Sequence, residues 1–163
     1  MLTLGFQETD LTSASPMQRI RFAQSGLSQG VDRPLWAQVS LWQLEETRCA
    51  LVAIDPIGFG LEHAACLRAR LTALLRCSPE QVMLCFSHTH AAPTTVCRRT
   101  SALYRLPPRR FRTCARFASP GGCGEVDIGV NRRDGKAVDR RAGLLKVTDT
   151  ALPPDSGSAV CSC

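Results

Sequence analysis

Hydrophobic and polar residues alternate along residues 35–44, a period of two that is typical of a half-buried β-strand. After a polar connection at 45–48, the run 49–55 is almost continuously apolar, as in a strand buried on both faces. The two segments predict a β-hairpin that enters the centre of a sheet. The apolar residues that share one face of its first strand are Leu35, Ala37, Val39 and Leu41.

The spacing becomes helical over residues 61–76, and residues 82–86 then form another wholly apolar run, which predicts a strand. Strand, helix and strand in succession make a βαβ unit, whose strands are normally parallel. Ligands of such sheets gather beyond the carboxyl ends of the strands. Asp55 ends one of these strands and residues 87–90 follow the other, so we expect them at the same rim. The predicted helix carries its apolar stripe at Ala64, Leu67, Leu71, Leu74 and Leu75, opposed by Arg68, Arg70 and Arg76.

The rest of the chain divides into segments that differ in hydrophobic periodicity and composition. Residues 2–6 predict a short first strand, so that residues 1–95 form an α/β core with a mixed sheet and a βαβ unit. Residues 96–124 are rich in arginine, proline and cysteine and show no sustained period, which predicts an irregular segment. Within 125–149, residues 125–131 alternate like a half-exposed strand and 144–148 predict another; residues 150–163 predict a disordered tail.

The positive charge belongs to one segment. Subtracting the seven arginines between residues 97 and 123 from the formal charge of +6 leaves −1 for the remainder. Together with nearby aromatic residues, these arginines could contact nucleic acid through residues 98–116. However, the Pro107-Pro108 pair breaks helices and no recognition motif is present, so a solvated loop is favoured and a nucleic-acid partner is not expected. The arginines are Arg98, Arg99, Arg105, Arg109, Arg110, Arg112 and Arg116.

The cysteines and the N-terminus bear on the cellular compartment. Nine cysteines occur without any C-x-x-C pair. The sequence shows no signal peptide and no apolar run of about 18 residues, the length that a membrane-spanning helix requires. We therefore expect reduced cysteines in a cytoplasmic protein without a transmembrane segment.

Two of the three histidines, His88 and His90, stand one residue apart at the end of the predicted strand 82–86. Strand side chains repeat every second residue, so this spacing can place both imidazoles on one side of the backbone. Imidazoles are good zinc ligands, but a catalytic zinc ion needs three protein ligands and an open water position. The spacing alone is more often structural than metal-binding. The third histidine, His63, lies beside Glu62 on the predicted helix, where a solvated position is favoured.

The stretch SHTHAAPTT at residues 87–95 resembles the THTHSGP-type signature of the neutral/alkaline non-lysosomal ceramidase family, zinc-dependent amidases that cleave the N-acyl bond of ceramide. Further similar segments follow in the family's order: LGFQETDLT at 4–12, the hairpin at 30–59, SPEQVMLCF at 78–86, and the strand segment 125–149. The resemblance covers roughly residues 2–95 and 125–149. It implies a partial version of the ceramidase catalytic domain, in which His88 is a zinc ligand and His90 is a catalytic residue that contacts the scissile amide of a small-molecule or lipid substrate.

Departures from the family pattern lie downstream of the histidine pair. The family's second zinc histidine follows the strand that residues 144–148 begin, and its glutamate, tyrosine and serine lie later still, whereas no histidine follows His90 here. We therefore expect an incomplete zinc site in a truncated or frame-disrupted bacterial member, a fragment of an amidohydrolase that is inactive alone. The alternatives are a non-catalytic remnant and a nucleic-acid-binding protein. Unpaired strand edges would favour self-association.

Overall fold

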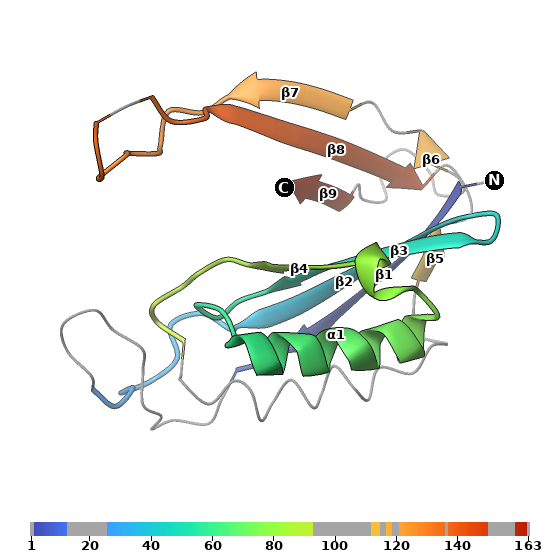
Figure 1. The fold of residues 1–163 in the computed structure, drawn as a ribbon, viewed down its shortest axis with the longest axis horizontal. Coiled ribbons are helices and arrows are strands. Elements are labelled where there is room, and N and C mark those ends of the chain that lie inside the picture. The colour runs from blue at the N-terminus through green and yellow to red at the C-terminus, as the bar shows by residue number, and fades with distance from the viewer. Residues whose placement is uncertain are drawn as a thin grey trace. The chain divides into compact units, whose positions relative to one another are not determined.

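The structure, a computed structural model, describes residues 2–12, 26–92, 112–114, 117–118, 121–135, 137–149 and 159–162. The chain divides into two compact units, one of residues 3–113 and one of residues 1–2 with 114–163. The first unit contains the sheet and helix that carry the histidine pair, and the second is a smaller sheet (Figure 1).

The sheet of the first unit has the strand order β4-β3-β2-β1-β5. Strands β2 and β3 form the predicted antiparallel hairpin, with Val39 opposite Val52, whereas β3 and β4 are parallel, with Val52 opposite Leu84. The mixed sheet with its βαβ unit is therefore confirmed. Its strands are β1 (Leu2–Asp10), β2 (Trp36–Leu44), β3 (Thr47–Ile54), β4 (Val82–Phe86) and β5 (Arg112–Cys114).

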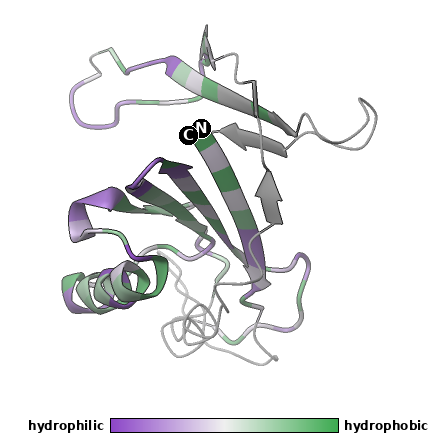
Figure 2. Ribbon diagram, turned by 90° about the vertical axis from the view of Figure 1, so that its right-hand side faces the viewer, coloured by the Kyte–Doolittle hydropathy of each residue, from purple (hydrophilic) through white to green (hydrophobic). Residues whose placement is uncertain are grey.

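Helix α1 (Leu61–Leu75) covers one face of this sheet, and the apolar stripe predicted for it is the buried side (Figure 1). Leu67 and Leu71 are almost completely buried against Val39 and Val52 of the sheet, which belong to the same hydrophobic cluster. The helix ends at Arg76, a left-handed residue whose backbone N–H donates to the carbonyl of Thr72. A short 3₁₀ helix (Pro79–Gln81) then leads into β4. Apolar and polar residues alternate along β1 and β2 (Figure 2), as in strands with one covered face, whereas β3 and β4 are mainly apolar.

Cys77, between the helix and the 3₁₀ turn, is buried. Its burial raises the pKa of the thiol, and the neighbouring Arg48 guanidinium lowers it by a smaller amount. Cys49 and Cys66, by contrast, are exposed. Both stand in apolar segments, but Cys66 lies on the solvent side of α1 and Cys49 near the start of β3.

The second unit is a small antiparallel sheet in which β8 (Arg141–Asp149) pairs with β6 (Phe117–Ala118), β7 (Gly121–Glu125) and β9 (Ala159–Ser162). The strand predicted over 125–131 is wrong, because strand pairing with β8 ends at Glu125. The strand instead occupies the glycine-rich residues before it, in the segment expected to be irregular. Likewise β9 lies within the tail expected to be disordered. These strands form through backbone hydrogen bonds to the long β8. The spacing of apolar side chains in the sequence does not reveal such pairing.

In the described part of the chain, we find no helix that could span a membrane. The arginine-rich segment 98–116 lies outside the described residues except for Arg112–Cys114. The expectation that this segment is a solvated loop without a nucleic-acid partner therefore stays a prediction.

Candidate functional site

Polar residues meet at the end of the sheet where β3 and β4 stop. Ile54 and Phe86 are opposite one another in the parallel pairing, so Asp55 and Ser87 follow on neighbouring strands. The backbone N–H of Ser87 donates to the carbonyl of Ile54 at 3.0 Å, which holds the two strand ends together. The predicted common rim of the sheet is thus confirmed.

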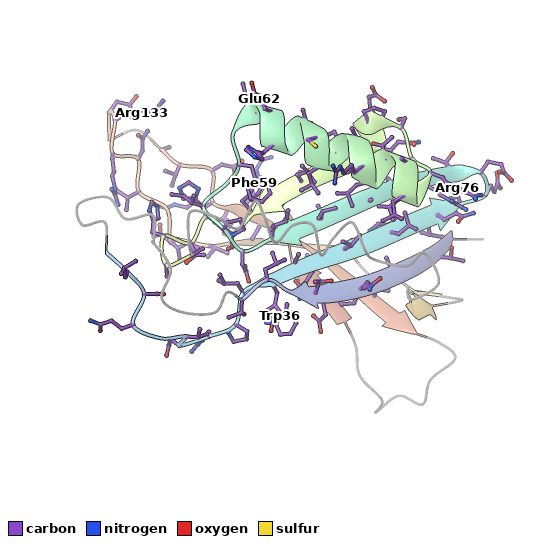
Figure 3. All side chains as sticks on the ribbon, turned by 90° about the horizontal axis from the view of Figure 1, so that it is seen from below. Trp36, Phe59, Glu62, Arg76 and Arg133 are labelled. Atoms are coloured by element: carbon purple, nitrogen blue, oxygen red, sulfur yellow. The ribbon has the colours of Figure 1, made fainter. Side chains whose placement is uncertain are left out.

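The Asp55 carboxylate is fixed to the beginning of β2. Its Oδ2 accepts a hydrogen bond from the backbone N–H of Trp36 at 2.9 Å, and the Asp55 N–H donates to the Trp36 carbonyl at 3.0 Å. Both residues are half-buried, and Figure 3 shows Trp36 at this end of the sheet. Sequence reasoning placed Asp55 at the rim but missed this pairing. The carboxylate serves to join two strands, which is a structural role.

The end of β1 is attached to the same corner. Leu11 donates its N–H to the Leu35 carbonyl at 2.7 Å, and the Leu35 N–H donates to Thr12 Oγ1 at 2.9 Å. Thr12 in turn donates its N–H to Asp10 Oδ1 at 2.7 Å, which forms a tight turn after the strand. Leu11 is completely buried. The Asp-Leu-Thr sequence at residues 10–12 therefore fastens the end of β1 to the residue before β2, beside the hydrogen bonds of Asp55.

The histidine pair lies on the turn that leaves β4. His88 has a φ of 60°, in the left-handed region that residues other than glycine rarely adopt. The rings of His88 and His90 lie edge to face, with 5.1 Å between their centroids and 78° between their planes. The prediction that the pair comes together is confirmed, but strand alternation is not the reason. Strand β4 ends at Phe86, and the left-handed turn at His88 brings the rings together.

The surroundings of the two rings differ. His88 is exposed, whereas His90 is half-buried with its Nδ1 atom shielded from solvent. Ala92, two residues on, is 1 % exposed and belongs to the hydrophobic core, so it anchors the turn to the body of the unit. On the strand side, Phe86 packs edge to face against Phe59 at 5.0 Å between ring centroids. The turn that carries the histidines is therefore held at both ends by apolar contacts.

These residues do not complete a catalytic zinc site. No group of three histidine, cysteine, aspartate or glutamate side chains placed to hold a metal ion occurs in the part of the chain that the structure describes. His63 is exposed on α1, which agrees with the solvated position favoured for it. A catalytic zinc ion takes three protein ligands, and the rim offers the two imidazoles. The assignments of His88 as a zinc ligand and His90 as a catalytic residue stay predictions.

No protein-family model and no curated protein matches this sequence. Solved structures do match. The structure of neutral ceramidase from Pseudomonas aeruginosa superposes with a TM-score of 0.67 at 16% sequence identity, over 92% of this chain. The fold is ceramidase-like. A second structure, of ceramidase complexed with C2, gives a TM-score of 0.68 at 16% identity, also over 92% of this chain.

The likeness covers a minor part of those proteins. This chain spans 30% of the Pseudomonas ceramidase chain and 29% of the second. At 16% identity the comparison supports the arrangement of strands and helix and does not extend to chemistry. It confirms the part of the resemblance that concerns fold, a partial ceramidase-like domain.

Proposed function

We propose that this chain is the N-terminal part of a ceramidase-like amidohydrolase, an enzyme that cleaves an N-acyl amide bond such as that of ceramide. The observation that carries the proposal is the His88-x-His90 pair on the turn after β4, within a fold similar to that of neutral ceramidase. The pair lies at the carboxyl end of parallel strands, where sheets of this kind bind their ligands. A lipid or other small-molecule amide is the substrate class that this reading implies.

In this proposal the two histidines have different roles. His88 is exposed at the turn and serves as one ligand of a zinc ion, while the half-buried His90 contacts the scissile amide. Among the described residues, no group of three side chains that could hold a metal ion includes His88. We propose on this basis that the chain alone holds zinc weakly and does not turn over substrate.

Hydrolysis of an N-acylsphingosine by the purified full chain, with and without added zinc, tests this function. We expect no turnover above that of the His88→Ala and His90→Ala variants, because the ligand set is incomplete. His63→Ala is the matched control, since it removes an exposed histidine from α1 and leaves the rim intact. Zinc at one ion per chain together with turnover that His88→Ala abolishes would show a complete enzyme and contradict the fragment reading.

A non-catalytic remnant is the second candidate, and the lack of a third metal ligand among the described residues favours it. The enzyme-fragment and remnant proposals differ in whether zinc binding, in the absence of turnover, depends on His88. A fragment of a zinc enzyme loses this zinc in His88→Ala and keeps it in His63→Ala. A remnant shows no difference between the two variants.

A further inference from the structure

The connection between β7 and β8 carries an aspartyl-glycyl pair, Asp134-Gly135, in an exposed turn. Residues 132–134 form the turn, and both members of the pair are exposed; Figure 3 shows Arg133 extending from the same turn. No other aspartate or asparagine of the sequence precedes a glycine. The main-chain nitrogen after an aspartate can close a five-membered ring on the side-chain carboxyl carbon. A Cβ on the following residue hinders this approach, and glycine has none.

The surroundings of Gly135 leave its nitrogen able to react. Its φ is 66°, in the left-handed region, and a Cβ built on it would meet no atom within 4 Å. In the part of the chain that the structure describes, the Gly135 N–H donates no hydrogen bond. The backbone here is therefore neither packed nor held in a ladder, so rotation about Asp134 can bring the nitrogen onto the carboxyl carbon.

Asn131 places a hydrogen-bond donor on the group that would be attacked. Its Nδ2 donates to Asp134 Oδ1 at 2.6 Å, while its Oδ1 accepts the Arg133 N–H at 3.0 Å. The amide is thus fixed on both sides. A fixed donor stabilises the negative charge that develops on a carboxyl oxygen when its carbon is attacked. The turn therefore supplies the nucleophile and a group that polarises the electrophile.

We propose that Asp134 is a modification site, at which the chain isomerises spontaneously to isoaspartate. The Gly135 nitrogen bonds to Asp134 Cγ, and the carboxyl hydroxyl leaves with the amide proton as water, which gives a succinimide. Water then adds to the main-chain carbonyl carbon of this ring and breaks its bond to the nitrogen. The peptide link now runs through Cγ, and the former main-chain carboxyl becomes a side group. Water is lost once and regained once, so no co-reactant is consumed.

Other exposed aspartates in the described ranges lack one of these conditions. Asp32 lies in an exposed bend but precedes an arginine. Asp127 precedes an isoleucine, whose β-branched side chain is stiff and crowds the nitrogen. Asp139 also precedes an arginine, and its two carboxylate oxygens accept hydrogen bonds from Arg141 at 2.9 and 2.7 Å. These residues are internal references for Asp134. The proposal holds whether or not the chain is part of an amidohydrolase.

Ageing the full chain at neutral pH in water labelled with heavy oxygen tests this assignment. Transfer of labelled methyl groups from S-adenosylmethionine by a protein isoaspartyl methyltransferase measures the amount of isoaspartate. Peptide mass spectrometry with electron-transfer fragmentation locates it. We expect isoaspartate at residue 134 to accumulate at least severalfold faster than at Asp32, with heavy oxygen incorporated at the same residue. Equal accumulation at the two residues overturns the proposal.

Substitutions within the exposed turn give a second readout. Asp134→Glu keeps a carboxylate but requires a six-membered ring, so the methylation at this position should be lost. Asp134→Asn should accelerate accumulation severalfold, because a neutral amide stays electrophilic at a pH where a carboxyl group is ionised. Asp32→Glu is the matched control and should leave the total unchanged. Methylation that persists in Asp134→Glu and disappears in Asp32→Glu would overturn the proposal and assign the site to Asp32.

The part assigned to Asn131 is tested separately. Asn131→Ala removes the donor at Asp134 Oδ1 and should slow the accumulation of isoaspartate severalfold. Arg132→Ala, on the neighbouring exposed residue of the turn, is the control and should leave the rate unchanged. A rate that is unchanged or higher in Asn131→Ala would overturn the role of its amide in polarising the carboxyl group.

Discussion

Asp55 and Trp36 are joined by two hydrogen bonds, from the Trp36 N–H to the Asp55 carboxylate at 2.9 Å and from the Asp55 N–H to the Trp36 carbonyl at 3.0 Å. The first closes the β2–β3 hairpin at the end opposite its turn. It also places an acidic side chain at the rim that carries the histidines. The carboxylate in this position is thus part of the sheet's construction.

Replacing Asp55 tests this structural role. Asp55→Ala leaves the Trp36 N–H without its acceptor, so we expect the free energy of unfolding to fall by about 1–3 kcal/mol. Asp55→Asn keeps an acceptor oxygen and should lose less. Urea denaturation measures both. The matched control is Glu8→Ala, which removes an exposed hydrogen bond to Gln38 and should change stability by less than about 0.5 kcal/mol. Equal effects of the Asp55 and Glu8 variants would show that the carboxylate does not hold the hairpin.

The packing of α1 on the sheet predicts a large difference between two leucines of the same helix. Leu71 is fully buried and Leu61 is 90% exposed. Leu71→Ala should lower the free energy of unfolding by about 2–5 kcal/mol, because it leaves a cavity against the sheet. Leu61→Ala should be within about 0.5 kcal/mol of the unsubstituted chain. Similar losses at both positions, measured by denaturant unfolding, would contradict the assigned buried face.

The left-handed turn at His88 predicts that glycine is favoured there. A side chain at a positive φ costs about 1–2 kcal/mol, which glycine does not incur. His88→Gly should therefore be more stable than His88→Ala by roughly 1 kcal/mol, because alanine keeps the strain and glycine relieves it. Thermal unfolding of the two variants measures this difference. At His63, in the first turn of α1, the order should be reversed, with His63→Ala more stable than His63→Gly. If alanine were the more stable substitution at His88 as well, the left-handed conformation of His88 would be excluded.

The buried thiol of Cys77 predicts a stability change at alkaline pH. Its pKa is raised above the ordinary value of 9.0 in the folded chain, mainly by burial. The thiol then ionises at lower pH in the unfolded chain than in the folded one, so the free energy of unfolding falls as the pH rises past 9.0. In Cys77→Ala, the free energy of unfolding should therefore fall less between pH 8 and 11 than in the unsubstituted chain. Urea unfolding at a series of pH values measures this difference. An identical pH dependence in the variant would show that the thiol is accessible to water.

Periodicity in the sequence predicts β2, β3, α1 and β4 of the first unit, but not β5, which lies in the segment expected to be irregular. The apolar run at 82–86 became β4 at those residues, and the helical stripe became the buried face of α1. In both cases a side-chain pattern and a covered face go together, because burial drives the local structure. The second unit lacks that relation. Gly121–Glu125 is a strand whose residues are all exposed, so its pairing with β8 leaves no hydrophobic pattern to read.

The sequence predicts where the candidate site lies on the sheet, but not the hydrogen bonds and backbone conformation of its residues. Parallel β3 and β4 had to bring Asp55 and Ser87 to one rim, which required only the order of the elements. The hydrogen bonds of Asp55 with Trp36 and the left-handed φ of His88 depend on three-dimensional contacts that residue types do not encode locally. Val126, Ile128 and Val130 show the converse, because their alternation predicts a strand, whereas β7 ends at Glu125 and these side chains are exposed.

The most direct test of the ceramidase-like reading is the zinc affinity of the full chain, measured by competition with a chromophoric chelator for the unsubstituted protein and for His88→Ala, His90→Ala and His63→Ala. An incomplete site that holds zinc through His88 predicts weak binding of one zinc ion per chain. That binding should be lost in His88→Ala and unchanged in His63→Ala. Zinc binding that is equal in His88→Ala and His63→Ala would contradict the assignment of the rim as part of a zinc site.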